Sequence, residues 1–126
     1  MNNTVYIVAG DEMLKIMKEK HPENLAVPFR EDMSQGPSSG KAFDMDFITA
    51  RASFWRVSKD SYIENMLPVI ELDADDDYIL CFGEDDCCQA NLKCAIKYLR
   101  NKGCTRPMTV RIVDELDLTV KREYTV

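Results

Sequence analysis

Two short acidic segments, each directly behind a glycine that ends an apolar run, are the first places in this chain where chemistry is possible. Asp11 follows Gly10 after the run TVYIVA, and its neighbour Glu12 is acidic as well. Glu84 follows Gly83 after the run YILCF. Carboxylates so placed can bind a cation, an amine, a hydroxylated ligand, or a phosphate carried with Mg²⁺, whereas a bare phosphate would be repelled. Their alternative role is to cap helices and complement the helix dipole.

The turn-rich stretch 30–43 contributes three further polar candidates: Asp32, Ser34 and Gly36. A nucleophilic role for Ser34 would need a histidine partner, and the single histidine, His21, lies beside a proline at a predicted helix end. We therefore expect the Ser34 hydroxyl to stabilise the turn or to hydrogen-bond a ligand.

Arg51 is a charged residue on what we predict to be an apolar helix face. It lies three or four positions from four apolar residues that we expect to pack in the core: Phe47, Ile48, Phe54 and Trp55. An inward guanidinium needs a carboxylate or a bound anion, so we predict an ion pair from Arg51 to Asp32 or Asp11. Such a pair either organises a site or only holds the helix to the preceding loop.

Compact apolar runs predict the strands, and apolar residues at helical spacing predict the helices, that position these residues. Strands are expected at 4–9, 25–29, 78–82, 109–113 and 118–126, and helices at 11–20, 44–57, 58–67 and 85–101. The alternation of strands with helices along the chain predicts a single α/β domain over residues 1–126. We expect a three-layer sandwich with a mostly parallel sheet, flavodoxin-like or Rossmann-like, in strand order near 2-1-3-4 with a C-terminal antiparallel edge strand.

A parallel sheet binds ligands beyond the carboxyl ends of its strands. Because the polar segments above follow strand ends, we expect them to meet at one edge of the sheet, with Gly10 and Gly83 on neighbouring strands. The predicted ligand-binding residues are Gly10, Asp11, Asp32, Ser34, Gly36, Arg51, Gly83, Glu84 and Gln89. A metal site is the weaker alternative, with Asp11, Asp32 and Glu84 as ligands and Mg²⁺ as the candidate cofactor.

Composition narrows the class of protein. The 126 residues carry a net charge of −6 and no basic block, which argues against nucleic acid as a partner. The chain opens without a signal-peptide pattern and has no apolar run long enough for a membrane span. The five cysteines form no spaced framework, so we expect free thiols and a cytoplasmic protein, with Cys81, Cys88 and Cys94 at least partly buried.

The chain carries EDMSQGP at residues 31–37, RASFW at 51–55 and FGE at 82–84. These three segments are similar to those of a bacterial family catalogued as domain of unknown function 1835. Residues 31–37 (EDMSQGP) resemble its D-D-L-S-x-G-P motif, and residues 51–55 (RASFW) resemble its R-x-x-F-W segment. Phe82-Gly83-Glu84, with Gln89 and Leu92, resembles its W-x-G-x-x-x-x-E-Q-L segment. The resemblance implies an α/β fold and no function, since none is established for the family.

The chain departs from the family pattern at three positions. Glu12 replaces a serine after the shared Gly10-Asp11 landmark, Glu31 replaces the first aspartate of the motif, and Cys88 replaces a glutamate.

Three hypotheses of function follow from the residues, and they leave open whether the protein is an enzyme. The leading one is a domain that binds a small molecule or a nucleotide-type ligand at the carboxyl ends of the strands. The second is a divalent-metal-dependent hydrolase or transferase. The third is a protein-interaction module without pocket chemistry, which would be favoured if helix N–H groups consumed the acidic side chains. The oligomeric state stays open.

Overall fold

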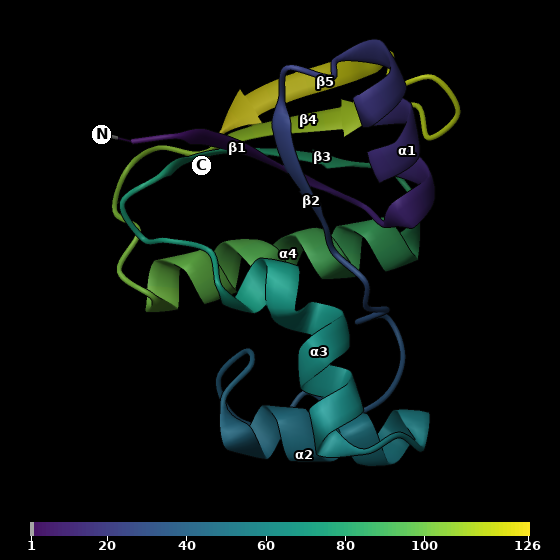
Figure 1. Ribbon diagram of the computed structural model, residues 1–126, viewed down its shortest axis with the longest axis vertical. Coiled ribbons are helices and arrows are strands. Elements are labelled where there is room, and N and C mark those ends of the chain that lie inside the picture. The colour runs from purple at the N-terminus through teal and green to yellow at the C-terminus, as the bar shows by residue number, and fades with distance from the viewer. Residues whose placement is uncertain (1) are drawn as a thin grey trace.

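The computed structural model describes residues 2–126 as one five-stranded sheet with four helices around it (Figure 1). In chain order the elements are β1 (Thr4–Val8), α1 (Asp11–Lys20), β2 (Leu25–Pro28), α2 (Met45–Trp55), α3 (Lys59–Ile70), β3 (Asp77–Phe82), α4 (Asp86–Asn101), β4 (Thr109–Val113) and β5 (Val120–Thr125). Each predicted element is present, with ends within three residues of the expected ones.

The sheet has the order β2-β1-β3-β4-β5, parallel throughout except for β4 and β5, which confirms the predicted topology. The crossover from β2 to β3 is the long one, and it carries both α2 and α3. Pro28 lies in the outer strand β2, where a missing N–H costs little. The order is that of a flavodoxin-like sheet with a reversed final strand.

The three layers are α1, the sheet, and the remaining helices (Figure 1). On one face, Met13 and Met17 of α1 pack against Val8, Cys81 and Val113. On the other face lies the larger core, in which the buried side chains of α4 and α3 meet the strands. Burial of apolar side chains on both faces explains why β1 and β3 read as continuous apolar runs.

Helix α2 lies farthest from the sheet, beyond α3 (Figure 1). It begins at the N-cap Asp44, whose carboxylate accepts a hydrogen bond from the Phe47 N–H at 2.9 Å. Helix α3 begins at Ser58, whose hydroxyl accepts from the Ser61 N–H. Asp44 and Ser58 are the first residues of the helices predicted at 44–57 and 58–67, so both helix starts are encoded locally.

The predicted end of α3 is wrong, because the helix continues through Pro68 to Ile70. Proline removes one helical hydrogen bond, but Val69 in the following turn is completely buried. Burial of that turn outweighs the local preference to stop. None of the four helices within residues 2–126 is long and apolar enough to cross a membrane.

Candidate functional site

Strands β1 and β3 end side by side at the same edge of the sheet. The register pairs Val8 with Cys81, so Gly10 and Gly83 each lie two residues beyond a paired position. The prediction that these glycines occupy neighbouring strand ends is therefore confirmed. The loop after β2 reaches the same edge, since Val8 also pairs with Pro28.

Glu31, just after β2, carries a buried carboxylate that organises this region. Its side chain is 2% exposed and accepts two hydrogen bonds from the Arg51 guanidinium, at 2.7 and 3.0 Å. The indole Nε1 of Trp55 donates to it at 2.8 Å, and the hydroxyl of Tyr62 donates to its other oxygen. Its own neighbour Asp32 adds a backbone N–H. Side chains of α2 and α3 thus converge on one carboxylate.

Arg51 is fully buried, as its helical phase predicted, but its carboxylate partner is Glu31 rather than Asp32 or Asp11. Its other N–H groups donate to the backbone carbonyls of Asp32, Gln35 and Pro37 at 2.6–2.9 Å. All five guanidinium N–H groups are then engaged. Arg51 clamps the loop after β2 onto α2, and it has no donor left for a ligand.

Asp32 is not the partner of Arg51 because its carboxylate folds back on its own loop. It accepts from the Ser34 N–H at 3.0 Å, from the Ser34 hydroxyl, and from the Gln35 amide at 2.7 Å. These bonds, the one from Ser34 above all, lower the pKa of Asp32 to about 2. Ser34 therefore stabilises the turn, one of its two predicted roles.

The protonation states in the network follow from their environments. Burial by itself would raise the pKa of Glu31, but hydrogen bonds from Arg51, Tyr62 and the Asp32 N–H hold it below its usual range. Burial, together with the neighbouring Glu31 carboxylate, raises the pKa of Tyr62. Tyr62 is accordingly a neutral donor to an ionised carboxylate.

Helix α4 holds the loop from the other side. The buried side chain of Asn91 accepts from the Met33 N–H at 2.8 Å and donates to the Glu31 carbonyl at 2.6 Å. Gly36 has a φ of +80°, and a Cβ there would lie 2.7 Å from the Phe54 ring. The loop after β2 is thus a fixed structural element, and a glycine is needed where it approaches α2.

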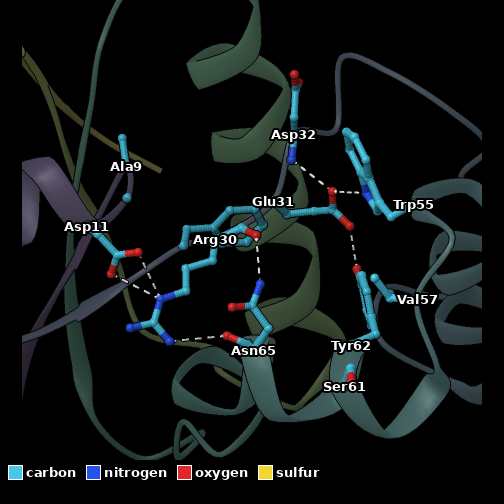
Figure 2. A pocket seen from close by; sticks show the side chains of 12 residues that line it. Ala9, Asp11, Arg30, Glu31, Asp32, Trp55, Val57, Ser61, Tyr62 and Asn65 are labelled. Carbon is cyan, nitrogen blue, oxygen red and sulfur yellow. Dashed lines mark hydrogen bonds and ion pairs between the residues drawn. The ribbon is translucent and has the colours of Figure 1, made fainter.

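A cavity of about 640 Å³ opens beside this network, between the carboxyl ends of β1 and β2 and the helices α2 and α3 (Figure 2). The volume is in the range of small-molecule sites. Its lining residues come from four segments: Ala9, Gly10, Asp11, Phe29, Arg30, Glu31, Asp32, Trp55, Val57, Ser61, Tyr62 and Asn65.

An ion pair marks the sheet side of the cavity. The Nε atom of Arg30 lies 3.0 and 3.3 Å from the two carboxylate oxygens of Asp11, and its Nη1 donates to the Asn65 carbonyl at 3.4 Å (Figure 2). Helix α1 starts at Gly10 without a side-chain cap, so Asp11 does not consume the helix N–H groups. Acidic side chains consumed by helix N–H groups would have favoured the hypothesis of a protein-interaction module. This arrangement is not observed at the start of α1.

The predicted site residues fall into three groups. Gly10, Asp11 and Asp32 line the cavity; Figure 2 shows the Asp32 carboxylate pointing away from Glu31. The three residues that stabilise the loop instead are Ser34, Gly36 and Arg51. The three residues on the β3 side lie outside the cavity lining: Gly83, Glu84 and Gln89. Sequence reasoning placed the pocket between β1 and β3, whereas the cavity opens toward β2 because the α2–α3 crossover builds its wall there.

The β3 side has polar contacts of its own. Gln89 donates to the Gly83 carbonyl at 2.7 Å, and Glu84 lies 3.6 Å from the Lys121 ammonium. The predicted metal ligands Asp11, Asp32 and Glu84 are not brought together. Within residues 2–126, the group of possible ligands close enough for one ion is Asp85, Cys88 and Glu115. The three ligands predicted for a metal ion therefore do not form a metal site.

Several cavity residues were not predicted: Arg30, Glu31, Trp55, Ser61, Tyr62 and Asn65. Arg30 and Glu31 follow β2 directly, so the rule that selected Asp11 would also have found them. Trp55 was expected in the core, but it is 38% exposed and Phe54 is 40% exposed. Tyr62 and Asn65 share a face of α3 at helical spacing, and nothing in their spacing says that this face borders a cavity.

Protein-family models, curated proteins and solved structures were each compared with the chain. None of the three comparisons finds a match. Function is therefore inferred from the geometry of the site.

Proposed function

We propose that this domain binds a small organic ligand with a planar ring, in the cavity between β1, β2, α2 and α3. The observation that carries the proposal is Trp55, a large aromatic ring held in a fixed orientation in the cavity wall while remaining 38% exposed. Exposed, rigid aromatic surface is typical of sites that stack on a ring.

Three contacts hold the Trp55 ring. Its Nε1 donates to the buried Glu31 carboxylate at 2.8 Å. The Arg51 guanidinium lies 5.7 Å from the ring centroid, and the Phe54 ring meets it edge-on at 4.8 Å. A ring so held loses little conformational freedom when a ligand stacks on it, which favours affinity.

The polar groups around the cavity can orient such a ligand. Arg30 and Asp11 form a charged pair at one side, and the side chains of Ser61 and Asn65 line the wall formed by α3. An apolar cavity with a few polar groups that fix orientation is the usual composition of a small-molecule site.

We also infer membership of the family of domain of unknown function 1835, and a bacterial, cytoplasmic protein. In support, residues of two resembling segments are directly bonded: Arg51 and Trp55 of the RASFW segment donate to Glu31 of the EDMSQGP segment. All five cysteines are free, and such thiols fit a reducing compartment.

Trp55 is the only tryptophan in the chain, so its fluorescence reports on the cavity directly. The experiment titrates the protein with adenosine, uridine, AMP and riboflavin, following Trp55 emission for the first three and melting temperature for all four. We expect at least one of these ligands to quench the emission and raise the melting temperature.

Calorimetry then compares Trp55→Ala with Met45→Ala. Met45 is exposed at the other end of α2 and lies outside the cavity lining, so it is a matched control. Trp55→Ala should weaken binding about tenfold or more, the loss expected for one stacked ring, whereas Met45→Ala should bind normally. If none of the four ligands changes either signal, the proposal fails.

A further inference from the structure

We propose that the ligand is a nucleoside, with its base against Trp55 and its ribose hydroxyls on the Asp11–Arg30 ion pair. The inference rests on the function proposed above and names the ligand class of the same cavity. It follows from the different chemistry of the two sides of the cavity and from the charges at one of them.

The two sides of the cavity suit different parts of one ligand. Figure 2 shows Asp11 and Arg30 at one side, Trp55 and Val57 at the opposite side, and Asn65 between them. The Trp55 side offers aromatic and apolar surface, whereas the Asp11 side offers a carboxylate and a guanidinium. A ligand that fills the cavity therefore joins a planar ring to a polar group.

The ion pair has unused hydrogen-bonding capacity on both partners. Arg30 directs its Nε at the Asp11 carboxylate and its Nη1 at the Asn65 carbonyl, and its Nη2 donates to no group within residues 2–126. The Asp11 side chain is 65% exposed, so its oxygens retain free lone pairs. A vicinal diol can donate to the Asp11 carboxylate while accepting from the free N–H groups of Arg30.

A neutral diol fits the local charge better than a phosphate does. Asp11 and Glu12 both lie in the first turn of α1, where their negative charges complement the helix dipole. A phosphate there would have to approach two carboxylates and compete with Asp11 for Arg30. A diol adds hydrogen bonds without adding charge and leaves the Asp11–Arg30 pair intact.

The backbone at Gly10 leaves room for the sugar. Gly10 lines the cavity with a φ of +142°, and no atom lies within 4 Å of the position a Cβ would take. The chain therefore presents bare backbone beside the ion pair, as expected where a ligand approaches closely.

The test is calorimetry on the full chain with adenosine, 2′-deoxyadenosine and AMP, alongside uridine as a pyrimidine probe. We expect adenosine or uridine to bind. Removing the 2′-hydroxyl should cost about tenfold or more in affinity, because the Asp11 carboxylate loses a charged hydrogen bond. AMP should bind no more tightly than adenosine.

Two variants assign the effect to the ion pair. Asp11→Asn should weaken adenosine binding about tenfold while leaving 2′-deoxyadenosine nearly unchanged, since the carboxylate is the group that recognises the diol. Glu12→Gln removes the same charge from the same turn of α1 at a residue outside the cavity lining, and it should bind like the wild type. Asp11 is exposed, so its replacement should preserve the fold.

The failures of the two proposals are distinguishable. AMP binding more than about tenfold tighter than adenosine would overturn the diol assignment, as would equal affinity for 2′-deoxyadenosine. Riboflavin binding with no response to either nucleoside would overturn the nucleoside inference and keep the ring-binding function. If no ring-bearing probe binds, both the ring-binding function and the nucleoside inference are overturned.

Discussion

At the scale of single residues, the Glu31–Arg51 pair is the most consequential feature of the site. Both side chains are buried, and every N–H of the guanidinium meets an acceptor. A buried pair is costly to break from one side, because the remaining charge is left without a partner. The pair therefore acts as an internal support for the loop and for Trp55.

Removing Arg51 alone should be strongly destabilising. Arg51→Met keeps much of the volume and leaves the Glu31 carboxylate buried without its cation, so we expect a loss of about 3–5 kcal/mol in the free energy of unfolding. The double variant Glu31→Gln/Arg51→Met should lose less than the sum of the two single variants, because no charge is then orphaned. Urea denaturation measures all three.

Arg56→Met serves as the control, since Arg56 is an exposed arginine next to the same helix. Its effect should stay within about 0.5 kcal/mol. Strict additivity of the Glu31 and Arg51 substitutions would show that the pair does not act as a unit.

Asp32 should make the free energy of unfolding depend on pH in the acidic range. Its pKa is about 2 in the folded protein, chiefly because of the Ser34 hydrogen bonds, and a free aspartate titrates near 3.9. A carboxylate with a depressed pKa stabilises the fold above the unfolded value, and that stability is lost as pH falls through the folded one. Between about pH 4 and pH 2, Asp32→Asn should therefore flatten the fall in unfolding free energy seen for the wild type.

Urea denaturation at several pH values in that window measures the effect. Glu64→Gln is the matched control, because the exposed Glu64 carboxylate makes no hydrogen bond or ion pair in the described part of the chain. A wild-type slope in Asp32→Asn would contradict the role given to the turn.

At the scale of elements, the ends of the strands and helices decide what the cavity contains. The α2–α3 crossover brings Trp55 and Tyr62 over the loop that follows β2, and Asn91 of α4 fastens that loop from the opposite side. The opposite wall depends on Gly10, where β1 turns into α1. The cavity thus depends on two junctions that lie far apart in the sequence.

Gly10→Ala should destabilise the protein through its backbone alone. The φ of +142° and ψ of −174° belong to a region that is essentially restricted to glycine, and no neighbouring atom would clash with the added methyl group. We expect a loss of about 1–3 kcal/mol, together with a weaker response to cavity ligands.

Gly103→Ala is the control for the ligand effect. Gly103 also has a positive φ, with open space around it, but it follows the end of α4 and lies outside the cavity lining. It should lose stability and keep the ligand response. A full ligand response in Gly10→Ala would exclude close approach of the ligand to this glycine.

At the scale of the whole molecule, the sheet buries most of the thiols. Cys81, Cys88 and Cys104 are buried, and Cys87 and Cys94 are half-buried. Burial raises the pKa of Cys87 to about 11 and that of Cys94 to about 12. These two thiols are consequently protonated and slow to react while the fold is intact.

The number of thiols that react with a disulfide-exchange reagent, and their rates, should follow how deeply each thiol is buried. We expect all five to react at once in denaturant, and at most the two half-buried ones to react, slowly, in the native protein. Cys87→Ser should lower the count in denaturant to four and leave at most one thiol reacting in the native protein, which serves as the control. Fast reaction of three or more thiols in the native state would show that the sheet opens readily.

Much of the architecture could be read from local patterns. Apolar runs ending in Gly10 and Gly83 predicted two adjacent parallel strands, and the caps Asp44 and Ser58 predicted two helix starts. The inward direction of Arg51 followed from its helical phase. The apolar runs, the helix starts and the helical phase of Arg51 depend on residues close together in the chain, so the sequence determines them by itself. The adjacency of β1 and β3 follows from the general tendency of alternating strands and helices to form a parallel sheet.

The identity of the site was decided by tertiary structure. The carboxylate partner of Arg51 is Glu31, one position before the predicted Asp32. The Asp32 side chain is held instead by hydrogen bonds from Ser34 and Gln35. Exposure of Trp55, and the opening of the cavity toward β2 rather than β3, depend on how the α2–α3 crossover packs. Periodicity shows which face of a helix is buried; only the packing of distant segments decides which polar atoms that face meets.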